Sequence, residues 1–130
     1  MALTINGKQA HWHVRGPNFV GVHELFDQIV ANAQGFADTA AERIVALGLP
    51  VDARLATVAA KSKPTAVPAG FTKSDAMIAD VIADMDAAIV NVQAAIDGLG
   101  EIDQTSQDVA VEIMRGLEKD RWFLFAHISE

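Results

Sequence analysis

Apolar side chains recur at helical spacing over long stretches of the chain, and this periodicity constrains the fold more than any other feature. The pattern runs from Asn18 to Leu47, from Thr72 to Gly100, and from Thr105 to Phe125. Residues three or four positions apart lie on one face of a helix, so each stretch predicts a helix with one apolar side. The first of these helices is expected to stop at Gly48, because glycine with Pro50 close behind it is typical of a helix end.

A shorter helix is predicted at Leu3–Val14, and the sequence RGPN, residues 15–18, then turns the chain. Pro17 is placed to start the next helix rather than to continue the first. A linker at 49–72, with one short helical turn around Leu55, precedes the third long helix. Two helical hairpins joined by a long connection predict an all-α four-helix bundle with one crossover.

Side-chain caps are predicted at two helix starts. Thr72 with Asp75 has the spacing of a capping box, and Thr105 with Asp108 repeats it before the last helix. In such a box the hydroxyl accepts a backbone N–H that the first turn of a helix leaves without a partner.

The composition agrees with a helical domain. The chain has 130 residues, enough for one domain with a core, and we expect a single domain over residues 1–130. Hydrophobic residues make up 51% of the chain, which excludes disorder. Alanine is plentiful and tyrosine is absent, which favours an all-α protein.

Charge and cysteine content limit the classes of partner. The formal net charge is -7, so the chain repels nucleic acid and anionic lipid and attracts cations. It contains no cysteine, which excludes disulfides and thiolate metal sites and fits a reducing cytoplasm. No apolar run reaches about 18 residues, and the start of the chain lacks the pattern of a signal peptide. We therefore expect a cytoplasmic protein that does not enter the membrane.

The predicted helix at 18–47 carries two pairs of side chains of the kind that bind metal ions. His23 and Asp27 are one turn apart, and so are Asp38 and Glu42. At about 100° per residue, all of them fall on an arc about 100° wide, on the outer flank of the helix. The apolar stripe, which must face the core, consists of Val22, Phe26, Ile29, Ala33, Ala40, Ile44 and Leu47. The metal-type side chains therefore point away from their own bundle.

One chain does not bring the two pairs together. Asp27 and Asp38 lie about 16 Å apart along the axis, which is too far for one metal ion. Both pairs are nevertheless centred on one point, because the midpoint of 27 and 38 and the midpoint of 23 and 42 are both 32.5. A second copy of the helix, antiparallel about a twofold axis there, places the first pair of each chain opposite the second pair of the other. The spacing predicts two equivalent metal sites at a dimer interface.

Other residues of the same helix agree with an interface. The residues around the predicted axis are small enough for close helix approach: Ala31, Asn32, Ala33 and Gly35. Val20, Ala31 and Val45 on the outer arc suit an interface better than water.

A third histidine completes the predicted site. His11 lies on the preceding helix, and the turn at 15–18 can bring it back beside His23. His13 lies about 200° round the helix from His11, so the two cannot serve one site. The alternative is that the first pair makes only a surface hydrogen bond and that the second pair forms a solvated face with Arg43.

The chain closely resembles the Dps family of mini-ferritins, the DNA-binding proteins from starved cells. The resemblance is carried by KQAHWHVRGPNFVGVHELFD at 8–27, ADTAAERIVALG at 37–48 and LEKDRWFLFAHI at 117–128. The family pattern has a histidine before tryptophan, then a histidine, an aspartate, an aspartate and a glutamate at fixed spacing. This chain matches all five positions, at His11, His23, Asp27, Asp38 and Glu42.

The resemblance implies a ferritin-like bundle that assembles from twofold dimers into a hollow dodecamer. It implies two-iron ferroxidase sites at the dimer interfaces, with the first three ligands from one chain and the last two from its partner. Fe(II) is oxidised there to Fe(III), preferentially by hydrogen peroxide, and ferric oxide is stored, which protects the cell and its DNA. Imidazole and carboxylate ligands suit both iron states, and Zn(II) is expected to substitute for iron.

The resemblance extends to two further features. Trp12 corresponds to a tryptophan near the iron, which acts either as a one-electron donor or as a packed interface aromatic. Asp103, Asp108 and Glu112, near the start of the last helix, resemble the acidic residues of the family's threefold iron-entry pores. The alternative is that these acidic residues complement the helix dipole.

The chain also departs from the family. Family members have several more helical turns before the His-Trp pair, so the first helix is expected to be truncated here. His13 stands where the family usually has asparagine. Without a basic tail, this form is expected to bind DNA weakly or not at all. Two other hypotheses are a DNA-compacting nucleoid protein and an assembly that binds Zn(II) without redox turnover.

Overall fold

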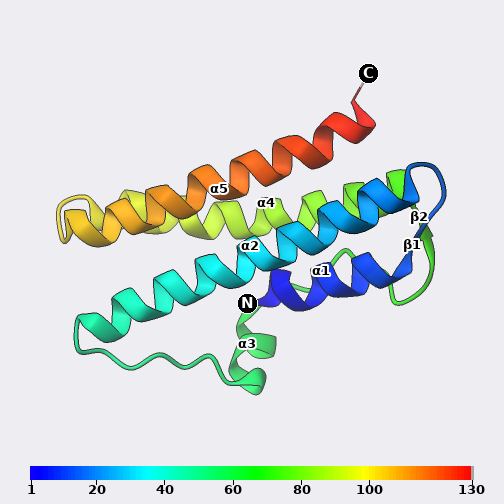
Figure 1. Cartoon of the computed structure of the whole chain (residues 1–130). Helices are drawn as coiled ribbons and strands as arrows, with labels where there is room; N and C mark the ends of the chain where they lie inside the picture. The colour runs from blue at the N-terminus through cyan, green and yellow to red at the C-terminus, as the bar shows by residue number, and fades with distance from the viewer. Residues whose placement is uncertain (130) are drawn as a thin grey trace.

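The computed structural model of the chain describes residues 1–129, and helices make up nearly all of its regular structure (Figure 1). The elements in chain order are α1 (Ala2–His13), β1 (Val14–Arg15), α2 (Phe19–Ala46), α3 (Leu55–Lys61), β2 (Thr72–Lys73), α4 (Ser74–Leu99) and α5 (Gln104–Ile128). All the predicted helices are present, and their ends lie close to the predicted ones. Within residues 1–129, each helix is too short or too polar to span a lipid bilayer.

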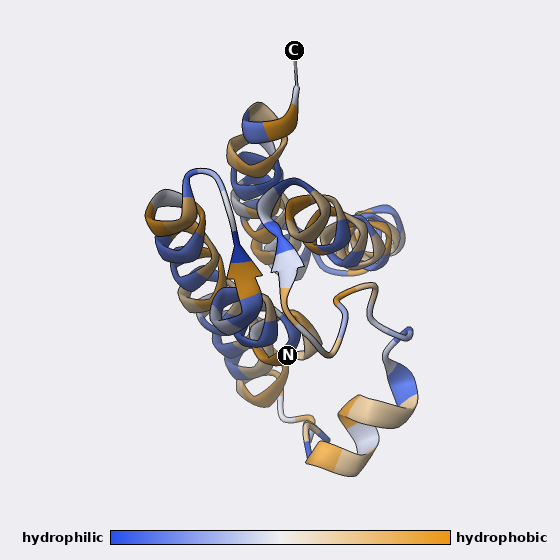
Figure 2. Cartoon of the chain, turned by 90° about the vertical axis from the view of Figure 1, so that its right-hand side faces the viewer, coloured by the Kyte–Doolittle hydropathy of each residue, from blue (hydrophilic) through white to orange (hydrophobic). Residues whose placement is uncertain are grey.

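The helices pack as two antiparallel hairpins. α1 lies against α2 and α4 against α5, while α2 also contacts α5 and α1 contacts α4, which closes a four-helix bundle (Figure 1). From the end of α2 the chain returns along the bundle through α3 before α4 begins. The predicted bundle with one long crossover is therefore confirmed. In Figure 2 α3 stands apart from the bundle, and none of its residues is buried.

Two short strands join the crossover to the turn between α1 and α2. They lie side by side in Figure 2 and pair in parallel, Val14 with Thr72 and Arg15 with Lys73. The turn that follows β1 uses left-handed backbone at Gly16, with φ of 105°, and at Asn18, with φ of 57°. Asn18 is the N-cap of α2, so Pro17 precedes the helix rather than starting it.

The core lies where all four helices of the bundle overlap. α2 and α4 contribute most of the fully buried large side chains. The largest of them are Phe26, Ile29, Met77, Ile78, Met85 and Leu124. Each belongs to a helical face whose residues recur at intervals of three or four, so the burial follows the sequence periodicity.

The second half of the predicted core stripe on α2 is not buried. Val22, Phe26 and Ile29 are 1% exposed, whereas Ile44 is 39% and Leu47 is 50% exposed. The cause is the difference in length, because α1 has 12 residues and α2 has 28. An antiparallel α1 of this length covers only the half of α2 nearest the turn. The uncovered half lines an apolar groove of about 440 Å³ between α2, α4 and α5.

Both predicted capping boxes are wrong. Thr72 lies in β2, where pairing with β1 holds the backbone extended, and α4 begins at Ser74 without a side-chain cap. At the last helix the N-cap is Asp103, whose carboxylate accepts the N–H of Thr105 at 3.1 Å, so α5 begins at Gln104. Aspartate is at least as good an N-cap as threonine.

Candidate metal centre

His11 and His23 lie together at the junction of α1 and α2. Their rings are stacked, with centroids 3.6 Å apart and an angle of 17° between the planes. His11 is 8% exposed, and His23 is half-buried. The turn at 15–18 therefore does bring His11 back beside His23, as the sequence predicts.

Each of these histidines donates a hydrogen bond to the backbone of the other. His11 Nδ1 lies 2.6 Å from the His23 carbonyl oxygen, and His23 Nδ1 lies 2.7 Å from the His11 carbonyl oxygen. A carbonyl oxygen only accepts, so the proton of each neutral ring is on Nδ1. Both Nε2 atoms then carry a free lone pair, which is the form of imidazole that binds a metal ion.

Asp27 lies one turn after His23 and is exposed. Its Oδ1 accepts a hydrogen bond from the ammonium group of Lys8 on α1. This bond is the main cause that lowers the pKa of Asp27, and the positive charge of Lys8 acts in the same direction. The carboxylate is thus ionised at neutral pH and paired with a protein cation.

A shallow hollow of about 580 Å³ opens over these side chains. The residues that line it include Asn32, which lies at the predicted twofold axis, and Glu24 and Gln28 on α2, which were not predicted to belong to the site. Asn32 also donates its amide to both carboxylate oxygens of Asp120 at 3.1 Å. Glu24 and Gln28 share the outer flank of α2 with the predicted ligands. Their helical spacing from His23 and Asp27 could therefore have predicted that they lie beside the site.

Asp38 and Glu42 are exposed farther along α2 and away from the histidines. Asp38 lines a different hollow, together with Gln34 and Gly35. Within residues 1–129, no three His, Asp or Glu side chains are close enough together to hold a metal ion. A single chain therefore brings His11 and His23 together but does not by itself assemble the five predicted ligands.

The face of α2 that carries the predicted ligands is also apolar in part. Val20 is 62% and Val45 is 60% exposed, and Ala31 between them is exposed as well. Gly35 has open space around it, since an added Cβ meets no atom within 4 Å. These exposures agree with the prediction that the outer arc of α2 does not face its own core.

Trp12 and His13 diverge from the histidine pair in different directions. Trp12 is 62% exposed, and its ring centroid is 5.9 Å from Lys8 Nζ. His13 Nδ1 lies 2.8 Å from the carbonyl oxygen of Gln9, and its ring lies 5.3 Å from that of Phe71. His13 thus lies away from the pair of His11 and His23, which agrees with the prediction that His11 and His13 do not serve one site.

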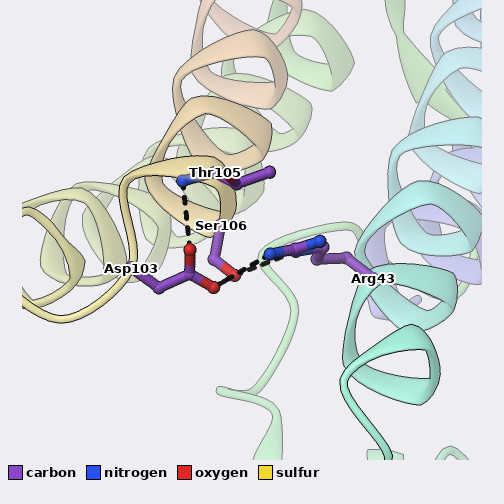
Figure 3. A network of polar contacts seen from close by, with 4 residues as sticks. All are labelled: Arg43, Asp103, Thr105 and Ser106. Carbon is purple, nitrogen blue, oxygen red and sulfur yellow. Dashed lines mark hydrogen bonds and ion pairs between the residues drawn. The ribbon is translucent and has the colours of Figure 1, made fainter.

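Asp103 belongs to a polar network between α5 and α2 (Figure 3). Its Oδ2 accepts from Arg43 at 3.0 Å and from the Ser106 hydroxyl, and its Oδ1 accepts the N–H of Thr105. Hydrogen bonds from Ser106 and Arg43 lower the pKa of Asp103 to about 2. Asp103 thus caps α5 and ties it to α2, and Arg43 is held here rather than beside Asp38.

The other predicted pore residues, Asp108 and Glu112, are exposed on α5.

The network makes a prediction about acid stability. A carboxylate with a depressed pKa stabilises the folded chain above its unfolded pKa and loses that effect as the pH falls through the folded value. For Asp103 the window runs from the ordinary value of 3.8 down to about 2. We expect Asp103→Asn to lower the Tm by a few degrees at neutral pH and the difference from the unsubstituted chain to shrink within that window. Thermal melts by circular dichroism measure this, with Asp108→Asn as control; a difference that persists unchanged at pH about 2 would contradict it.

The sequence is similar to that of known proteins over nearly its whole length. The ferritin family model, described as a ferritin-like domain, matches residues 1–130. The DNA protection during starvation protein of Agrobacterium fabrum is 35% identical over 130 residues, covering 98% of this chain and 80% of that protein. The protein of the same name from Mycolicibacterium smegmatis is 34% identical, covering 98% of this chain and 69% of that protein.

Solved structures agree closely with this fold. Dps from Microbacterium arborescens, in a structure described as the high iron form, superimposes with a TM-score of 0.97 at 64% identity, covering 99% of this chain and 84% of that chain. Dps92 from Deinococcus radiodurans superimposes with a TM-score of 0.90 at 28% identity, covering 96% of this chain and 76% of that chain. The similarity therefore extends over nearly the whole of the chain.

Proposed function

Because this chain belongs to the ferritin-like family and to the Dps proteins within it, we propose that it is a ferroxidase and iron-storage protein. In this proposal it oxidises Fe(II), preferentially with hydrogen peroxide, and stores the ferric product inside a dodecamer built from twofold dimers. Its substrates are Fe(II) and peroxide. Their joint removal protects the cell and its DNA from oxidative damage.

The histidine pair is the observation that carries this proposal. His11 and His23 hold each other through Nδ1, so two bare Nε2 atoms are oriented before any metal ion arrives. Preorganised imidazoles next to the ionised carboxylate of Asp27 form the beginning of a site for iron, and these donors tolerate both its oxidation states. Thiolates, which peroxide would oxidise, are absent from the sequence.

The remaining ligands are proposed to come from the partner chain. Asp38 and Glu42 are exposed on the same helix as His23, and a twofold axis near residue 32 places them opposite the histidines of the other chain. Two carboxylates from one side and three ligands from the other make a two-iron site at each end of the interface. Zn(II), which binds the same donors, is expected to occupy this site without turnover.

The proposed chemistry needs no other cofactor. Two Fe(II) ions each give one electron to a peroxide molecule, whose O–O bond breaks as both oxygens are reduced to the level of water. The Fe(III) ions then hydrolyse, release protons and form the oxide mineral. Trp12, exposed beside His11 in sequence, is proposed either as a one-electron donor to this reaction or as an interface aromatic. Asp108 and Glu112 are proposed, with Asp103, to line the route by which Fe(II) enters.

The first test is oxidation of Fe(II) by stoichiometric peroxide, followed by size exclusion with iron measured in each fraction. Rapid oxidation, with iron eluting in a shell-sized particle, is the expected result. Oxidation without a large particle would mean that dimers suffice for the site and that the cage does not form. A rate equal to that in buffer would contradict the ferroxidase proposal and favour a site that binds Zn(II) without turnover.

A second function, compaction of DNA in the nucleoid, is suggested by the name of the relatives, DNA protection during starvation protein. The net charge of -7 opposes it, because binding to phosphate depends on lysine and arginine contacts. We therefore propose that this chain acts in the bacterial cytoplasm and binds DNA weakly or not at all. A gel shift at low salt that is reversed by added salt would support the compaction function instead.

A further inference from the structure

Lys8 occupies a position that the proposed reaction has not explained. It lies on α1, one turn before His11, and its ammonium group crosses to α2 to pair with Asp27. The side chains of Lys8 and Asp27 are 36% and 51% exposed, and Asp27 is one of the residues that line the hollow over the histidines. A protein cation therefore already sits on one of the carboxylates proposed to receive a metal cation.

This pairing already engages one of the three proposed ligands that belong to a single chain. The Asp27 oxygen that Lys8 holds is engaged in a charge-assisted hydrogen bond. His11, His23 and Asp27 do not form a group that can hold a metal ion within residues 1–129. An ion that binds the Asp27 carboxylate therefore either shares this carboxylate with the ammonium group of Lys8 or displaces that group from it.

We propose that Lys8 is the resident cation of the metal centre, and that it competes with the incoming divalent ion for Asp27 and so sets the affinity of the site. This inference rests on the proposed function, since it assigns a role at the same site. Lys8 is a positioning residue: it acts through Asp27. When Asp27 turns to the metal ion, the indole of Trp12 remains as a partner for the ammonium, already within the range of a cation–π contact.

Electrostatics give the competition its direction. A like charge next to a bound dication raises the free energy of the occupied site, and a protein ligand that must first be released lowers the apparent affinity. The repulsion grows when Fe(II) becomes Fe(III), so Lys8 favours departure of the oxidised ion toward the mineral. The site then acts as a place of turnover rather than of permanent storage.

An ordinary surface ion pair predicts a different outcome. If Lys8 only joins α1 to α2, its loss leaves the metal affinity unchanged or weakens it, because the histidines are less well held. If Lys8 competes with the metal ion, its loss strengthens binding. The sign of the change in affinity thus separates the two roles.

The experiment is a calorimetric titration of the assembled protein with Zn(II), which binds without redox turnover. Lys8→Met, which keeps most of the unbranched side chain and removes its charge, is expected to bind Zn(II) roughly tenfold more tightly. Lys8→Arg, which retains the charge, is expected to stay within about twofold of the unsubstituted protein. Lys63→Met, which removes an exposed lysine from the linker, is the control for net charge. The KM for Fe(II) in the oxidation assay should fall in Lys8→Met in the same proportion.

The outcomes separate this inference from the proposed function. Loss of Zn(II) binding in Asp38→Ala would support the proposed metal site. If Lys8→Met then binds Zn(II) as tightly as the unsubstituted protein, the proposed role of Lys8 is wrong. Binding that appears only in Lys8→Met would support it strongly. Absence of Zn(II) binding in every protein, or a tighter complex in Lys63→Met as well, would overturn it.

Discussion

Replacement of Asp38 by alanine is expected to abolish the oxidation of Fe(II) while the fold stays intact. Asp38 is exposed on α2 and lies outside the core, so its loss removes a proposed ligand and creates no cavity. Removal of groups that merely support a metal ligand typically lowers affinity or activity by 10- to 100-fold, so loss of a ligand should lower the rate by at least about 100-fold. The initial rate of oxidation with stoichiometric peroxide and the helical circular dichroism signal are the two measurements.

Mixing two inactive variants tests whether each site is shared by two chains. In a dimer of Asp38→Ala with His23→Ala, one site keeps all its ligands and the other loses two. Random mixing of the two inactive proteins should therefore recover about one quarter of the full activity, since half of the dimers are mixed and each has one intact site. No recovery would place the site within one chain. Glu118→Ala, exposed on α5, is the control and should retain full activity.

The second large effect concerns stability and the contact between α2 and α5. A Cβ built on Gly116 would lie 2.2 Å from Phe36 Cζ and 2.8 Å from Cε1 of the same ring. That ring packs against the hydrophobic core, so it has to swing away to admit even a methyl group. We expect Gly116→Ala to lower the free energy of unfolding by about 1–3 kcal/mol, in spite of the better helix propensity of alanine.

Gly98 is the matched control for this substitution. It also lies in a long helix, but a Cβ added there meets no atom within 4 Å. Gly98→Ala should therefore raise the free energy of unfolding by up to about 1 kcal/mol, through helix propensity alone. Urea unfolding of both variants measures the two effects. Effects of the same sign would contradict the close contact between Gly116 and Phe36.

Much of the fold follows from spacing along the chain. The helices appear where apolar residues recur at intervals of three or four, because that periodicity is a property of each segment alone. The outward direction of Asp38 and Glu42 follows from the same geometry, and both are exposed. The approach of His11 to His23 was also predictable, since a short turn leaves two antiparallel helices with few ways to pack.

Tertiary structure decided the features that depend on distant residues. The cap of α5 is Asp103, which is also paired with Arg43, sixty positions earlier in the sequence. Burial of the stripe on α2 ends before Ile44, because coverage depends on the length of α1 and not on the stripe itself. Two further features likewise depend on how α1 lies against α2. They are the hydrogen bonds that keep Nδ1 of both histidines protonated and the ion pair between Lys8 and Asp27. Periodicity states which face of a helix is apolar, whereas hydrogen-bond partners are set by where the helices meet.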